Sequence, residues 1–121
     1  MVICAVDDLM FSVKISAAAK AVNAAVSFER APGALLARIR EERPSLVIFD
    51  LNSSRLAPIE TIRAIKADDR LRATRTLGYA SHVQGDVIAA ARAAGCDEVL
   101  ARSAFSERLA DILATAPKPK A

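Results

Sequence analysis

The sequence is poor in aromatic side chains. Its 121 residues include no tryptophan, one tyrosine and four phenylalanines, although 53% of them are hydrophobic. The core must therefore be built mainly from Ala, Val, Ile and Leu. No apolar run approaches the roughly 20 residues that a membrane-spanning helix needs. The N-terminus also lacks a basic region ahead of an apolar stretch and a small-residue cleavage site, so we expect no signal peptide and a cytoplasmic protein.

The sequence also has few cysteine and histidine residues and a small net charge. Cys4 and Cys96 are too few for a disulfide framework and do not have metal-ligand spacing, so we expect both to be small buried residues. His82, the only histidine, is expected in an exposed loop. The net charge is +3, and the basic residues between positions 63 and 75 are interrupted by acids and carry no interleaved aromatics. This pattern indicates a solvated face rather than direct nucleic-acid binding.

What the sequence does contain is an alternation of two patterns, short apolar runs and longer segments with apolar residues at helical spacing. The strand-like segments are Val2–Val6, Ala25–Glu29, Leu46–Leu51, Thr76–Ala80 and Asp97–Ala101. The helix-like segments are Leu9–Val22, one that Pro32 and Gly33 open and Pro44 closes, and those carrying Ile59–Ile65, Val83–Ala91 (ending at Gly95) and Phe105–Leu113.

This alternation predicts an α/β fold in which helices cover both faces of a parallel sheet. For five such units we expect a flavodoxin-like (βα)5 three-layer sandwich with strand order 2-1-3-4-5. The run at Val26 alternates, as an edge strand does, whereas the runs at Val2 and Leu46 are continuously apolar, as central strands are. Residues 1–116 are expected to form one domain, with 117–121 as a flexible tail because its two prolines cannot continue a helix.

Two of the predicted central strands end in acids. Asp7 and Asp8 follow the first, in "VICAVDD", and Asp50 ends the third, in "LVIFD". In a sheet of this order the carboxyl ends of these neighbouring strands meet at the switch point, where ligands bind. Carboxylates this close need a counter-charge, and Mg²⁺ with its preference for oxygen ligands is a natural one. An aspartate neutralised in this way can accept a phosphoryl group. The competing interpretation is that Asp8 caps the helix that follows it.

The segment "AVDD" before a helix, "VIFD" at the end of the third strand and five βα units in one short chain resemble the receiver domain of bacterial two-component response regulators, from Val2 to about Leu113. The resemblance implies that Asp50 is the phosphoacceptor. It also implies that Asp8 ligates Mg²⁺, that Asp7 supports the ion through water, and that the backbone carbonyl of Asn52 is a further ligand. The phosphoryl donor in the family is a histidine kinase or a small acyl phosphate, and catalysis is limited to the receiver's own phosphorylation and dephosphorylation.

Other positions depart from the family pattern. Ala80 stands where the family has a Thr or Ser that contacts the phosphoryl group, and Ser81 supplies a hydroxyl only one residue later. Arg102 stands in place of the family's Lys, and Ser103 in place of the cis-proline after it. Arginine keeps the positive charge but not the compact shape of an ammonium group. The sequence is thus similar to an atypical receiver, with its acidic pocket kept and its transmission residues altered.

Two functions remain open at this point. In the first, Asp50 is phosphorylated with Mg²⁺, and the signal leaves through a face formed by the helix at Val83–Ala91, the strand at Asp97–Ala101 and the helix at Phe105–Leu113. In the second, the chain is a phosphorylation-independent protein-binding module. Because no output domain follows, either one is expected to act through a signalling protein in trans, such as a histidine kinase, or through a homodimer. A phosphohydrolase is disfavoured because "DLNSS" lacks the second acid of an Asp-x-Asp loop.

Overall fold

The chain folds around one parallel sheet whose strand order is β2-β1-β3-β4-β5, as the sequence predicts. The computed structural model describes residues 1–81 and 85–116. Residues 82–84, which include His82, and the predicted tail at 117–121 lie outside this described part. The strands are β1 (Val2–Ala5), β2 (Val26–Phe28), β3 (Leu46–Asp50), β4 (Arg75–Ala80) and β5 (Glu98–Ala101).

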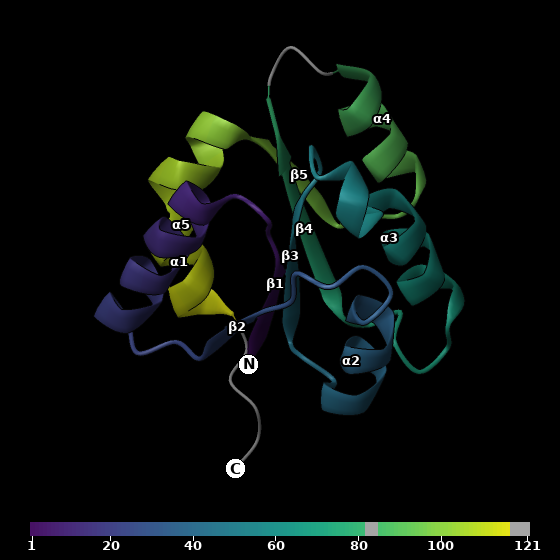
Figure 1. The fold of residues 1–121 in the computed structure, drawn as a ribbon, viewed down its shortest axis with the longest axis horizontal. Coiled ribbons are helices and arrows are strands. Elements are labelled where there is room, and N and C mark those ends of the chain that lie inside the picture. Colours follow the sequence, from purple (N-terminus) through teal and green to yellow (C-terminus); the bar gives the residue numbers. More distant parts are fainter. Residues whose placement is uncertain (82–84, 117–121) are drawn as a thin grey trace.

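Helices cover both faces of the sheet and complete the predicted three layers (Figure 1). The helices are α1 (Leu9–Ala21), α2 (Leu35–Glu42), α3 (Pro58–Ala67), α4 (Gly85–Ala93) and α5 (Arg102–Thr115), with a short 3₁₀ helix, η1 (Ser54–Leu56), after β3. α1 and α5 lie on one face, and α2, α3 and α4 lie on the other (Figure 1). The buried apolar residues accordingly form two clusters, one on each side of the sheet. Within the described residues no helix is long and apolar enough to cross a membrane.

The pattern of burial explains the strand order. Every residue of β1 and β3 is buried, whereas the residues of β2 are only half-buried, as the alternating sequence of an edge strand predicts. In the parallel register Val2 lies opposite both Val26 and Leu46, and Ala5 lies opposite Phe49. The segments that follow β1 and β3 therefore leave the sheet on the same side, where the carboxyl ends of the strands lie (upper side in Figure 1). We call this side the carboxyl edge of the sheet.

Left-handed backbone conformations mark several element ends. Gly95 follows α4 with φ +102°, as predicted for a residue just past a helix. The second helix begins at Leu35, later than its predicted opening at Pro32, because Gly33 has φ +86° and belongs to the turn before it. Ala57 is also left-handed, with φ 46° and ψ 58°, where η1 ends and α3 begins.

Candidate functional site

Asp50 is a buried carboxylate at the carboxyl end of the central strand β3. Its residue is 5% exposed, and its Oδ1 accepts a hydrogen bond of 3.0 Å from the backbone N–H of Asn52. Burial raises the pKa of Asp50 above its usual range, and the nearby negative charges of Asp8 and Asp7 act in the same direction. The Asn52 N–H and the positive charge of Arg102 oppose this shift. The surroundings of Asp50 therefore disfavour its charged form.

Asp8 has a structural role at the first turn of α1. Its Oδ1 accepts hydrogen bonds from the backbone N–H groups of Met10 at 2.8 Å and Phe11 at 3.2 Å. The Asp8 carbonyl also accepts a hydrogen bond of 2.9 Å from the hydroxyl of Ser12. These contacts make Asp8 the N-cap of α1, the interpretation that competes with a role in metal binding.

Asp7 is paired with Arg55, an arginine that no sequence pattern singles out. Arg55, on η1, donates from Nε to Oδ2 of Asp7 at 3.0 Å and from Nη2 to Oδ1 at 2.8 Å. The same Nη2 donates to the backbone carbonyl of Arg30 at 2.9 Å, just beyond β2. The hydrogen bond from Arg55 is the largest cause that lowers the pKa of Asp7. The only signal in the sequence is a basic residue shortly after Asp50, and that position does not tell which acid it pairs with.

These contacts decide how well the acidic edge fits a divalent cation. Carboxylate and carbonyl oxygens are the ligands that Mg²⁺ prefers. In the described part of the chain, however, no group of three or more Asp, Glu, His or Cys side chains is arranged to hold a metal. Both oxygens of Asp7 accept bonds from Arg55, Asp8 caps α1, and the carbonyl of Asn52 accepts the N–H of Ser54 at 3.1 Å. Because Arg55 holds both oxygens of Asp7, the side chains do not form a ready-made Mg²⁺ site.

The residues at the ends of β4 and β5 complete the rim of the site. Ala80, the last residue of β4, is fully buried on the side of α3 and α4. Ser81 follows it, and its backbone N–H donates to Oδ1 of Asn52 at 3.2 Å. Arg102 is the first residue of α5, and its guanidinium carbon lies 5.1 Å from the centroid of the Phe11 ring. Its buried Nε has no hydrogen-bond partner among the described residues.

An aromatic stack lies under this edge, on the side of α1 and α5. The Tyr79 ring stacks on Phe11 with centroids 5.0 Å apart and on Phe105 with centroids 4.4 Å apart. Tyr79 is fully buried, and its hydroxyl has no partner within the described part of the chain. Burial, followed by the negative charge of Asp50, raises the pKa of Tyr79 well above its usual range. Sequence reasoning missed this stack because the three aromatics are far apart in the chain.

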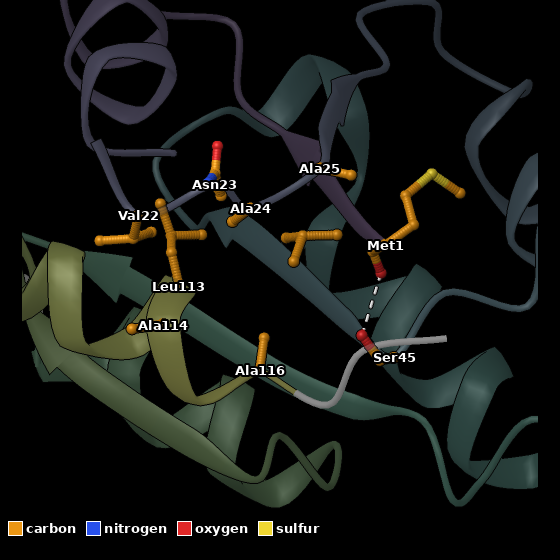
Figure 2. Close-up of a pocket in the computed structure, with 10 residues that line it drawn as sticks. Met1, Val22, Asn23, Ala24, Ala25, Ser45, Leu113, Ala114 and Ala116 are labelled. Atoms are coloured by element: carbon orange, nitrogen blue, oxygen red, sulfur yellow. Dashed lines mark hydrogen bonds between the residues drawn. The ribbon is translucent and has the colours of Figure 1, made fainter. Parts of the chain in front are cut away.

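All residues that the sequence singled out lie at or next to the carboxyl edge of the sheet: Asp7, Asp8, Asp50, Asn52, Ala80, Ser81 and Arg102. A hollow of about 330 Å³ lies at the opposite end, between the start of β1, the residues after α1 and the end of α5 (Figure 2). Its lining is mainly apolar, from Val22, Leu113 and small residues, and the Ser45 hydroxyl there donates to the Met1 carbonyl at 3.1 Å. None of the described residues that line it has a charged side chain.

Comparison with solved structures identifies the fold. No protein-family model matches the sequence, and no curated protein matches it. A response regulator from Hahella chejuensis has a TM-score of 0.83 and 18% identity, over 98% of both chains. The Mn²⁺-bound form of response regulator Rcp1 has a TM-score of 0.78 and 20% identity, also over 98% of both chains. The phosphorylated cyanobacterial phytochrome response regulator RcpA has a TM-score of 0.68 and 19% identity, over 93% of this chain and 88% of its own. The chain therefore has the flavodoxin-like fold of response-regulator receiver domains.

Proposed function

We propose that this chain is a signal-transduction receiver module that accepts a phosphoryl group on Asp50 and passes the signal to a protein partner. The observation that carries the proposal is the position of Asp50, buried at the carboxyl end of β3 and within the electrostatic reach of Arg102. Ligand sites of sheets with this order lie at this point. The shared fold adds support, because RcpA has it in a phosphorylated form.

The proposed reaction transfers a phosphoryl group to Asp50 from a donor such as a phosphohistidine or an acyl phosphate. An oxygen of the ionised Asp50 carboxylate attacks phosphorus, and the P–N or P–O bond of the donor breaks. The electron pair of that bond leaves with the imidazole or the carboxylate of the donor, and an aspartyl phosphate forms. Arg102, whose positive charge acts on Asp50, is the group we propose to stabilise the added phosphoryl oxygens. Ala80 offers them no hydroxyl, so we expect slow transfer.

We assign no reaction step to a divalent metal ion, but the assay should include one. The donors at the edge are hard oxygens, and Rcp1 has the same fold in a Mn²⁺-bound form. The pairing of Asp7 with Arg55 argues against a preformed site. The reaction should therefore be measured with Mg²⁺ and also with a chelator.

The test is intact-protein mass spectrometry after incubation with acetyl phosphate. We expect one added phosphoryl mass on the wild-type chain and none on Asp50→Asn. Asp69→Asn is the matched control, because Asp69 is 84% exposed and lies outside the site. It should still be phosphorylated. A wild-type chain that gains no phosphoryl mass with either Mg²⁺ or chelator would contradict the proposal.

A second candidate function is a protein-binding module that works without phosphorylation. The pairing of Asp7 with Arg55 and the missing hydroxyl at Ala80 favour it. Under either function the proposed partner is a histidine kinase or another signalling protein, or a second copy of the chain. The proposed docking face consists of α4, β5 and α5, where Arg108 pairs with Glu98 at 2.9 Å. If Asp50→Asn and a beryllofluoride adduct both leave partner affinity unchanged, the second function holds and the first is wrong.

A further inference from the structure

We propose that Arg55 is an internal counter-cation that occupies the Asp7 carboxylate and competes with divalent cations for the acidic edge of the sheet. In this chain the guanidinium group does electrostatically what a metal ion would do at Asp7. The biological role of this competition rests on the proposed function, since it concerns the same site. Its test measures metal binding and does not depend on phosphorylation.

The first argument is geometric. The Arg55 fork uses both oxygens of Asp7, through Nε to Oδ2 at 3.0 Å and Nη2 to Oδ1 at 2.8 Å. Two parallel, charge-assisted hydrogen bonds of this kind are specific in direction as well as favourable. A cation that used either oxygen would have to displace one of these bonds and would also be repelled by the guanidinium charge. The pair therefore excludes a metal ion from Asp7 as long as it is closed.

The second argument is that the backbone holds Arg55 in place. Its Nη2 also donates to the carbonyl of Arg30 at 2.9 Å, so one side chain ties the segments that follow β1, β2 and β3. η1, which carries Arg55, is anchored by Leu56, which is 3% exposed, and ends at the left-handed Ala57. Arg55 is thus directed at Asp7 by its surroundings.

The third argument is the balance of charge. Asp7, Asp8 and Asp50 carry three negative charges at one edge, and those of Asp8 and Asp7 raise the electrostatic cost of ionising Asp50. Arg55 lowers the pKa of Asp7, and Asp7 in turn raises the pKa of Arg55. The side chains remain 52% and 35% exposed, however. An ion pair this accessible to water is weak enough to be opened. We therefore expect competition with metal rather than permanent exclusion.

Binding of Mn²⁺ to the full chain tests the proposal, with free Mn²⁺ followed by electron paramagnetic resonance. Arg55→Gln should bind Mn²⁺ more tightly than wild type, by roughly two- to fivefold, the range for releasing an exposed ion pair. The matched control is Arg108→Gln. It removes the same charge from a pair of similar exposure, 51% against 52%, on α5. We expect it to change Mn²⁺ affinity little.

A double-mutant cycle isolates the contact with Asp7. In an Asp7→Asn background, Arg55→Gln should increase Mn²⁺ affinity less than it does in the wild-type background, because only the repulsion by the Arg55 charge is then removed. Equal affinities of Arg55→Gln and Arg108→Gln in the wild-type background would overturn the proposal, and so would an Arg55→Gln effect that is as large in the Asp7→Asn background as in the wild-type one. A wild-type chain that is phosphorylated but shows either result keeps its proposed function and loses only this inference. A chain that is not phosphorylated but shows the expected double-mutant cycle loses its proposed function and keeps this inference.

Discussion

At the scale of single residues, Ala57 carries a backbone conformation that its side chain disfavours. Its φ of 46° and ψ of 58° lie in the left-handed region, which costs a non-glycine residue about 1–2 kcal/mol. The conformation turns the chain from η1, which carries Arg55, into α3, which begins at Pro58. Strain is thus stored in the loop that positions the partner of Asp7.

Replacing Ala57 with glycine should relieve this strain. We expect Ala57→Gly to raise the free energy of unfolding by about 1 kcal/mol, because glycine adopts positive φ without penalty. Urea denaturation followed by circular dichroism measures the change. Ala64→Gly, in the middle of α3, is the matched control and should destabilise by about 0.5–1 kcal/mol. A loss of stability in Ala57→Gly equal to that of the control would show that Ala57 is not strained.

The residues of the site differ in how far the sequence could predict them. The end of an apolar run marks the end of a strand, so the local pattern predicts that Asp7 and Asp50 lie at strand ends. The N-cap role of Asp8 was foreseeable for the same reason. Arg55 was not, because its partner depends on the direction in which a strained loop points a long side chain. The pairing of Arg55 with Asp7 depends on the folded loop, and no residue spacing in the sequence indicates it.

At the scale of elements, β3 and β4 fit together through a glycine. A Cβ atom on Gly78 would lie 2.8 Å from Cδ1 and 2.9 Å from Cγ of Leu51, which is closer than real contacts. Leu51 is buried, and its N–H donates to the carbonyl of Tyr79 at 3.0 Å, so its backbone cannot easily retreat. The absence of a side chain at Gly78 is what lets the segment after Asp50 pack against β4.

Gly78→Ala should therefore destabilise the chain by about 1–3 kcal/mol, the usual cost of overpacking a core. Leu51→Ala alone should also destabilise, by leaving a cavity. The double variant should lose less than the sum of the two, because the shortened side chain makes room for the new methyl group. Unfolding in urea measures all three. Strictly additive losses would contradict the steric explanation.

Elements differ from residues in how well the sequence predicts them. The alternating run at Val26 and the unbroken runs at Val2 and Leu46 predicted the edge and central strands correctly, because burial on one or two faces dictates those patterns. Boundaries were less certain. The second helix begins at Leu35 because Gly33 lies in the preceding turn with positive φ, and the sequence alone does not distinguish a glycine that starts a helix from one that delays it. The contact between Gly78 and Leu51 depends on register and could not be predicted.

At the scale of the whole molecule, the fold places a carboxylate where its charge is costly. Burial raises the pKa of Asp50, so the folded chain holds a proton on this group more tightly than the unfolded chain does. The free energy of unfolding must then fall as pH rises from the pKa of the unfolded group, about 4, through the raised pKa of the folded one. Above the raised pKa the molecule bears the full cost. Such a cost is expected at a site kept for chemistry rather than for stability.

Asp50→Asn should remove this cost while keeping an oxygen that accepts the N–H of Asn52. We expect the variant to be more stable than wild type at pH 7, by about 1–3 kcal/mol, the range for an imperfectly compensated buried group. The difference should shrink as pH falls and vanish below about pH 4, where Asp50 is protonated in both states. Asp97, whose pKa is lowered, does not act on Asp50 and titrates alike in both proteins, so its effect cancels in the difference.

Urea denaturation of both proteins at a series of pH values measures this difference, with the exposed Asp69→Asn variant as the control that should show none. If the difference in the free energy of unfolding between variant and wild type grows with rising pH for Asp50→Asn but not for Asp69→Asn, the fold itself supplies the unfavourable environment. Phosphorylation or a bound cation would then act on a carboxylate that is already destabilised in its charged form. A difference in the free energy of unfolding that is independent of pH, or that has the opposite sign, would mean that Arg102 and the Asn52 N–H outweigh burial. The direction assigned to the pKa of Asp50 would then be wrong.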